Sequence, residues 1–138
     1  ANKYVAGFIG SPAMNFSDVK ISDEGGALYA TNAGMKIRVP DALKARIASQ
    51  TGQPAVLGIR PEDLRMATSA DAKDVLVDAT VEVSEQLGSE VILDVKVAGE
   101  GMVASVDPLT RVNPGQPIKL ALNPAGLRFF DAKSEAAL

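Results

Sequence analysis

Two segments of this chain, at 52–66 and 115–129, repeat each other without a gap. Each segment reads as a polar turn, an apolar strand, a turn marked by proline, and a second short strand that begins Leu-Arg. The offset is 63 residues, from Gly52 to Gly115. Gly, Gln, Pro, Leu, Pro, Leu and Arg are shared, at the pairs 52/115, 53/116, 54/117, 57/120, 61/124, 64/127 and 65/128.

The repetition predicts two small β lobes that are built on one plan and share a core. Two copies are too few for an open solenoid, which needs about three repeats or more. Chance convergence of turn–strand–turn patterns is the alternative explanation. The gapless register, with Gly-Gln-Pro at both starts, favours an internal duplication.

Composition limits the remaining classes. A chain of 138 residues fits one domain that buries roughly two thirds of its unfolded surface. It has no Cys, His or Trp, so it forms no disulfides and has no thiolate chemistry, which suits a reducing compartment. A net charge of −3 and a pI of about 4.9 match a phosphate backbone poorly. No apolar run approaches the ~18 residues of a membrane span.

The beginning of the chain, Ala1-Asn2-Lys3-Tyr4, lacks the basic region and apolar core of a signal peptide. Because the first residue is Ala, we expect either a removed initiator Met or a fragment of a longer polypeptide.

Alternation of apolar and polar residues predicts an antiparallel barrel or sandwich with one or two short helices. Helices are expected at 2–9 and at 40–50, the second with Pro40 in its first turn. Imperfect alternation at 13–21 indicates a bulge at Ser17-Asp18. In the strand expected at 74–87, one face consists of Val75, Val77, Ala79, Val81 and Val83. The tail after Asp131 reads as a frayed helical turn or disorder.

Residues that carry chemistry are scarce. No Gly-rich loop ends in Gly-Lys-Ser/Thr, so nothing in the chain is suited to hold nucleotide phosphates. Without His or Cys, only carboxylates, Lys and Tyr remain as acid–base or nucleophilic groups, and soft metal ligands are missing. Asp71, Asp74 and Asp78 are not spaced as a calcium loop. We therefore expect no catalytic site, cofactor or metal in this chain.

Several motifs, in order along the chain, resemble one family. The opening 2–16, the Leu57–Leu64 run around Gly-Ile-Arg-Pro-Glu, the Gln86–Glu90 turn and the close at Leu127–Asp131 resemble the regulatory domains of maltose-type ABC importer ATPase subunits. Tyr4 stands where Phe is usual in that family. The resemblance covers essentially the whole chain, and it implies a transport-associated OB-like (TOBE) fold.

The resemblance also implies an organisation and a function. Residues 1–12 would be a linker helix from a missing N-terminal ATPase domain, 13–131 the TOBE domain, and 132–138 a tail. The domain would not hydrolyse ATP; ATP and Mg²⁺ would belong to the missing domain. It would hold two subunits of a sugar importer together at the cytoplasmic face of the membrane. Expected partners are a second copy, the ATPase domain, permease subunits and a regulatory protein.

Two alternatives remain open. Residues 11–15 resemble a motif of molybdate-type domains that bind oxyanions at subunit interfaces, although few basic residues lie near it, Lys20 being the nearest that follows. A nucleic-acid-binding barrel is disfavoured, because single-strand binders need a basic groove with stacking aromatics.

The self-association surface is expected at two polar turns that are flanked by apolar strands. For any one residue of these turns, simple exposure to solvent is as good an explanation as a role in self-association. The first turn consists of Arg60, Pro61, Glu62 and Asp63, and the second of Gln86, Leu87, Gly88 and Ser89.

Overall fold

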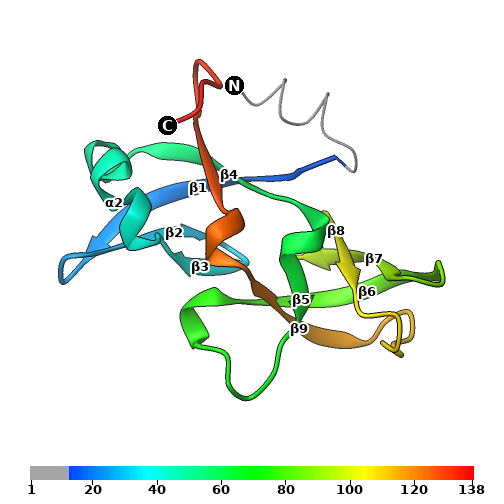
Figure 1. Cartoon of the computed structure of the whole chain (residues 1–138). Coiled ribbons are helices and arrows are strands. Elements are labelled where there is room, and N and C mark those ends of the chain that lie inside the picture. Colours follow the sequence, from blue (N-terminus) through cyan, green and yellow to red (C-terminus); the bar gives the residue numbers. More distant parts are fainter. Residues whose placement is uncertain (1–12) are drawn as a thin grey trace.

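The computed structural model describes residues 13–138, which form one curled antiparallel sheet with a single α-helix (Figure 1). The first half of the chain forms β1 (Asn15–Glu24), β2 (Ala27–Asn32), β3 (Met35–Arg38), α2 (Asp41–Ile47), η1 (Ala48–Gln50), β4 (Pro54–Ile59), η2 (Pro61–Asp63) and β5 (Leu64–Met66). The second half forms η3 (Lys73–Val75), β6 (Leu76–Gln86), β7 (Val91–Val97), β8 (Glu100–Val106), β9 (Pro117–Leu122), η4 (Pro124–Gly126) and β10 (Arg128–Asp131).

The strands follow the order β10-β4-β1-β2-β3-β6-β7-β8, and β9 pairs with both β5 and β6. The sheet curls into a half-barrel, and the hairpins β1–β2 and β6–β7 extend to opposite ends of the molecule (Figure 1). Branched aliphatic side chains from almost every strand fill one main core. The sequence-based prediction of a mostly β fold with a short helix is confirmed.

The internal duplication is visible in the backbone. Gly52 donates its N–H to Ile21 O at 2.7 Å, and Gly115 donates to Val81 O at the same distance. Both glycines have positive φ, +81° and +86°, which a side chain would oppose. Leu57 and Leu120, at matching positions of β4 and β9, are both fully buried. The two Gly-Gln-Pro segments therefore begin equivalent strands, as predicted.

The two halves also exchange their last strands. β5, from the first half, pairs with β9, from the second half, while β10 pairs with β4. The registers correspond: Arg65 lies opposite Ala121, and Arg128 lies opposite Gly58. Each half is thus completed by a strand of the other, which is why the lobes share one core.

The imperfect alternation in β1 has a different cause from the bulge that the sequence predicts. β1 pairs with β4 in unbroken register from Asn15 to Lys20. Val19 faces the main core, whereas Met14 packs in a second cluster with Val56 and Phe130. Because one stretch serves two apolar clusters, its pattern does not alternate cleanly.

The bulge lies in β6 instead, where the register with β7 shifts between Val81 and Val83. Val81 is buried, but Val83 is 51% exposed. The prediction that Val83 shares the buried face is therefore wrong, because a bulge turns the residues beyond it to the other face.

The tail is ordered: one turn is closed by the Glu135 N–H donating to Asp131 O at 2.9 Å, and an extended segment follows it. The expected helical turn is thus limited to 131–135, and the expected disorder is not observed. The Asp131 carboxylate accepts the N–H groups of Ser134 and Lys133 at 2.8 Å, and these hydrogen bonds lower its pKa. Residue Leu138 then donates its N–H to Phe129 O at 2.9 Å, so the tail returns along β10. The expected helix at 2–9 and the whole of the expected linker 1–12 lie outside the described residues.

Candidate interaction surfaces

The turn Arg60–Asp63 is divided between buried and exposed residues. Pro61 is buried, and the turn packs against β8, while Arg60 and Glu62 are exposed. Asp63 accepts the Asn123 N–H through its backbone oxygen at 2.8 Å, and the Asn123 amide through its carboxylate at 3.2 Å. Asp63 therefore joins the two repeated turns, and Arg60 and Glu62 are the exposed residues of this turn.

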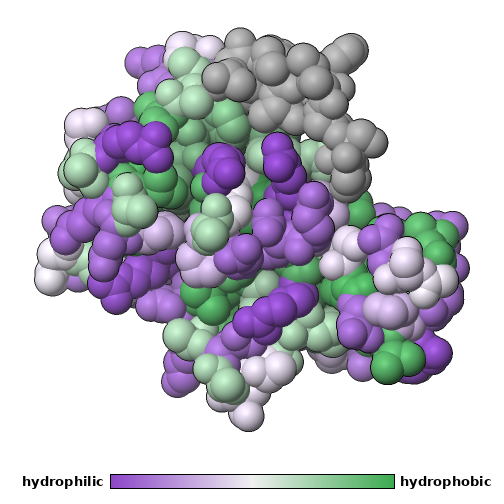
Figure 2. All heavy atoms as spheres, in the orientation of Figure 1, coloured by the Kyte–Doolittle hydropathy of each residue, from purple (hydrophilic) through white to green (hydrophobic). Residues whose placement is uncertain are grey.

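The turn Gln86–Ser89 lies at the outer end of the β6–β7 hairpin. Gln86 donates its amide to Pro108 O at 2.9 Å and accepts from Arg111 at 3.2 Å, which ties the turn to the loop after β8. Leu87 is 49% exposed, and Leu109, beside Pro108, is 78% exposed. Figure 2 shows hydrophobic side chains among polar ones at this right-hand end.

The structure does not bring the two predicted turns together. The first packs on β8, the second contacts the 107–111 loop, and no hydrogen bond or ion pair links them within residues 13–138. If both contact a partner, they do so as two separate patches.

Asn15, in the motif that resembles oxyanion-binding domains, has a structural task. Its amide donates to Val103 O at 2.8 Å and accepts the Val103 N–H at 2.9 Å. A side chain thus satisfies both outward backbone groups of an edge residue in β8, as a neighbouring strand would. Asn15 holds β8 against the start of β1.

We expect Asn15→Ala to lower the free energy of unfolding by about 1–2 kcal/mol, because both backbone groups of Val103 lose their partners. Urea unfolding followed by circular dichroism measures this. Asn32→Ala is the comparison: that side chain also makes several hydrogen bonds, but to Ser17 and Asp18 within the first half. An Asn15→Ala variant as stable as the wild type would show that the hydrogen bonds between Asn15 and Val103 contribute nothing to stability.

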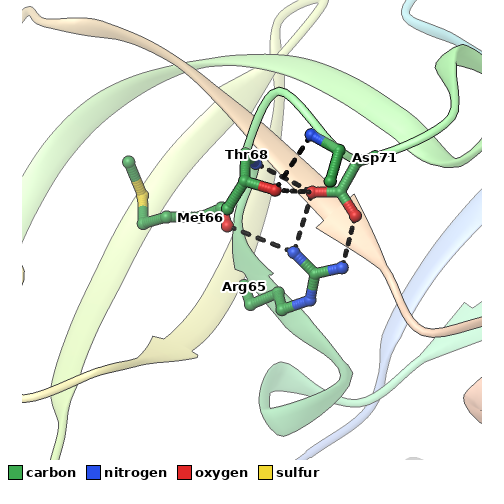
Figure 3. Close-up of polar contacts among 5 residues, drawn as sticks. Arg65, Met66, Thr68 and Asp71 are labelled. Carbon is green, nitrogen blue, oxygen red and sulfur yellow. Dashed lines mark hydrogen bonds and ion pairs between the residues drawn. The ribbon is translucent and has the colours of Figure 1, made fainter.

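The loop that follows β5 is held by an ion pair that the sequence analysis missed. Arg65 donates two hydrogen bonds to Asp71, at 2.8 and 2.5 Å, and the Thr68 N–H donates to the same carboxylate at 2.8 Å (Figure 3). The Arg65 hydrogen bonds, then that of Thr68, hold the pKa of Asp71 well below its usual range. The Thr-x-x-Asp spacing after Leu-Arg could have predicted this turn, because Asp and Thr side chains often accept hydrogen bonds from nearby backbone N–H groups in turns.

The lowered pKa predicts a pH-dependent loop. The ionised Asp71 stabilises the folded loop fully above the ordinary carboxyl pKa, and this contribution falls as pH drops from there towards the lower folded pKa. The protection factor of the Thr68 amide, which is its exchange rate measured against the intrinsic rate at the same pH, should therefore fall below about pH 4. Asp71→Asn should exchange faster than wild type at neutral pH and lose most of this pH dependence; equal exchange in both proteins at neutral pH would refute the loop-holding role.

A groove of about 530 Å³ lies between this loop and β9. Its apolar lining comes from Met66, Leu76 and Ile118, and its polar rim includes Lys73 and Lys119. Lys119 pairs with Asp78 at 2.7 Å. Two of the three aspartates that are not spaced as a calcium loop, Asp71 and Asp78, are thus engaged in ion pairs, with Arg65 and Lys119.

Within residues 13–138, no group of three His, Cys, Asp or Glu side chains is placed to hold a metal ion. The helix in the same region is too short and too polar to cross a membrane.

Comparison with known families agrees with the observed architecture. The model of the MalK OB fold domain matches residues 10–64, and that of the TOBE domain matches residues 57–130. The chain belongs to the TOBE domain family. In this TOBE domain the second match covers β5, all of β10 but Asp131, the whole repeated segment 115–129, and residues 57–66 of the first repeated segment.

Similar proteins are ATP-binding proteins of transporters. The chain is 42% identical to the multiple sugar-binding transport ATP-binding protein MsmK of Streptococcus mutans, over 100% of this chain and 37% of that protein. It is 34% identical to the trehalose/maltose import ATP-binding protein MalK of Thermococcus litoralis, over 100% of this chain and 38% of that protein. The chain thus spans under two fifths of the relatives it matches and corresponds to their C-terminal part.

A solved structure of the cytoplasmic molybdate-binding protein ModG shares the fold. It superposes with a TM-score of 0.63 at 13% identity, over 83% of this chain and 94% of that one. At this identity the likeness establishes the OB-like fold alone, which agrees with the fold predicted from the sequence.

Proposed function

We propose that this TOBE domain is the non-catalytic regulatory and dimerisation module of the ATP-binding subunit of a sugar ABC importer. The observation that carries the proposal is the match over the whole chain to sugar-transport ATP-binding proteins, together with the TOBE family match. In this proposal ATP and Mg²⁺ are bound by the remainder of the subunit, and this domain itself binds no cofactor.

The proposed partners are a second copy of the subunit, its own ATPase domain, the permease subunits and a regulatory protein. Through the permease the subunit would lie at the cytoplasmic face of the membrane. The rigidity of the domain supports this role, because exchanged strands join the two halves into one body. A module that links two subunits raises the effective concentration of their ATPase domains for each other.

The proposed contacts between copies are two separate patches: the exposed pair Arg60 and Glu62, and Leu87 at the hairpin end. Opposite charges side by side suit an isologous contact, in which Arg60 of one copy meets Glu62 of the other, and Glu62 of the first meets Arg60 of the second, across a two-fold axis. The contact need not be strong, since the ATPase domains of the parent would contribute further area.

Analytical ultracentrifugation of the 138-residue chain tests the proposal. We expect a weak monomer–dimer equilibrium that shifts towards monomer in Arg60→Glu and in Glu62→Arg. Lys44→Glu, at an exposed position on α2, is the matched control and should leave the equilibrium unchanged. A strict monomer at high micromolar concentration, or a dimer indifferent to both reversals, would remove the support for this surface.

A further inference from the structure

The groove beside β9 occupies a position that is filled in the other half of the molecule. In the first half, Phe16 lies opposite Gly58 and Asp18 opposite Val56. In the second half, the same register places Leu76 opposite Ala121 and Asp78 opposite Lys119. The duplication therefore makes Leu76 the counterpart of Phe16, and Lys119 the counterpart of Val56.

The exchanged strands extend the correspondence. In the first half, Phe130 lies opposite Val56 on β4. In the second half, Ala67 donates its N–H to Lys119 O at 3.0 Å, directly after β5. Ala67 is thus the counterpart of Phe130, and it lines the groove.

The two positions differ in what they contain. In the first half, Phe130 is buried with Met14 and Val56, and its ring meets that of Phe16 edge-on at 5.8 Å between centroids. In the second half, Ala67, Leu76 and Lys119 replace Phe130, Phe16 and Val56, so both aromatic rings are missing. Leu76 replaces most of the volume of one ring, whereas Ala67 leaves the space of one large aromatic side chain unfilled. The groove is the space that such a side chain occupies in the other half.

The rim of the groove adds a charge preference. Asp71 is neutralised by Arg65, and Lys119 by Asp78. Lys73 is exposed, lines the groove and forms no ion pair within the described part of the chain. An aromatic occupant with a carboxylate next to it is therefore favoured, because the carboxylate can pair with Lys73. This chain contains the same sequence, aromatic then acidic, at Phe130-Asp131 on β10.

We propose that this groove binds an aromatic side chain of a partner protein, presented on an extended segment with an acidic residue next to the aromatic one. The site is separate from Arg60, Glu62 and the hairpin end, so it stands or falls independently of the proposed dimer contact. It gives the domain a docking point for a regulatory protein segment.

The test uses three blocked dipeptides as probes, Phe-Asp, Phe-Lys and Ala-Asp, titrated into the ¹⁵N-labelled 138-residue chain. Phe-Asp is expected to shift the amide signals of Met66, Thr68 and Ile118. Phe-Lys should bind about two- to fivefold more weakly, because it lacks the exposed ion pair that the Asp of Phe-Asp makes with Lys73. Ala-Asp should cause no saturable shift. Shifts centred elsewhere, or equal shifts with Ala-Asp, would overturn the proposal.

Two variants sharpen the test. Ala67→Phe gives the second half the residue that fills the first half, and it should abolish the shifts; Ala72→Phe, on the same loop but outside the groove lining, is the control and should keep them. Lys73→Glu, at an exposed position that leaves the fold intact, should reverse the preference to Phe-Lys over Phe-Asp. An unchanged preference in Lys73→Glu, or undiminished binding by Ala67→Phe, contradicts the proposed site.

Discussion

Replacing either Leu57 or Leu120 by Ala is expected to lower the free energy of unfolding by about 2–5 kcal/mol. Both side chains are fully buried in the main core, and they occupy matching positions on β4 and β9. Each substitution removes three buried carbon atoms and leaves a cavity. The side chains around it are already close-packed in the main core, so they cannot move in to fill it. Chemical denaturation with a linear extrapolation measures the loss.

The exchanged strands make this prediction specific. Because β5 completes the second half and β10 completes the first, a cavity in either half should weaken the whole molecule. We therefore expect one cooperative transition in both variants, with the same midpoint by far-ultraviolet circular dichroism and Tyr fluorescence. Val83→Ala, at a side chain that is 51% exposed, is the control and should cost under about 0.5 kcal/mol. A two-step melt in Leu120→Ala would mean that the halves fold separately.

The duplication could be predicted from the sequence because its signal is local. Gly52 and Gly115 stand where the backbone needs positive φ, and each is followed by Pro at the start of a strand. The hairpin turns at Gly25-Gly26 and Gly88 follow from the same chemistry. Such positions constrain their residue type without reference to the rest of the chain.

The strand exchange could not be predicted in this way. β5 and β10 read alike, and each offers the same short apolar pattern to β4 and to β9. Which partner each strand takes is decided by the path of the chain in space. The bulge in β6 was missed for a related reason: Val83 continues an unbroken alternation in sequence, and only the pairing with β7 shows the shift.

For the candidate surfaces too, local features could be predicted from the sequence, whereas contacts between distant residues could not. The sequence indicated the turns at Arg60–Asp63 and Gln86–Ser89, but not that Asp63 is engaged with Asn123. Nor could it show that Asn15 reaches Val103, because 88 residues separate the pair. The groove became visible only when the two halves were compared, since it is defined by what the first half contains and the second lacks.

A second large effect is expected where two corresponding hairpin turns meet. A Cβ added at Gly34, in the β2–β3 turn, would lie 2.8 Å from both Ala98 Cβ and Val97 Cγ1, in the β7–β8 turn. This contact lies between the two halves of the molecule, so a side chain at position 34 can be accommodated only if one of the two hairpins moves. Gly34→Val is therefore expected to lower the free energy of unfolding by about 3 kcal/mol, at the upper end of the usual cost of overpacking.

Gly101 supplies the matched control for this substitution. Neither glycine has a positive φ, so neither substitution adds the strain of a left-handed backbone, and a Cβ at Gly101 meets only the flexible end of Lys96, at 3.8 Å. Gly101→Val should be neutral or slightly stabilising, because valine suits a strand. Thermal and urea unfolding of the pair measure the difference. If both variants lose the same stability, the cost comes from the glycine backbone and the two hairpins are not packed as tightly as the structure has them.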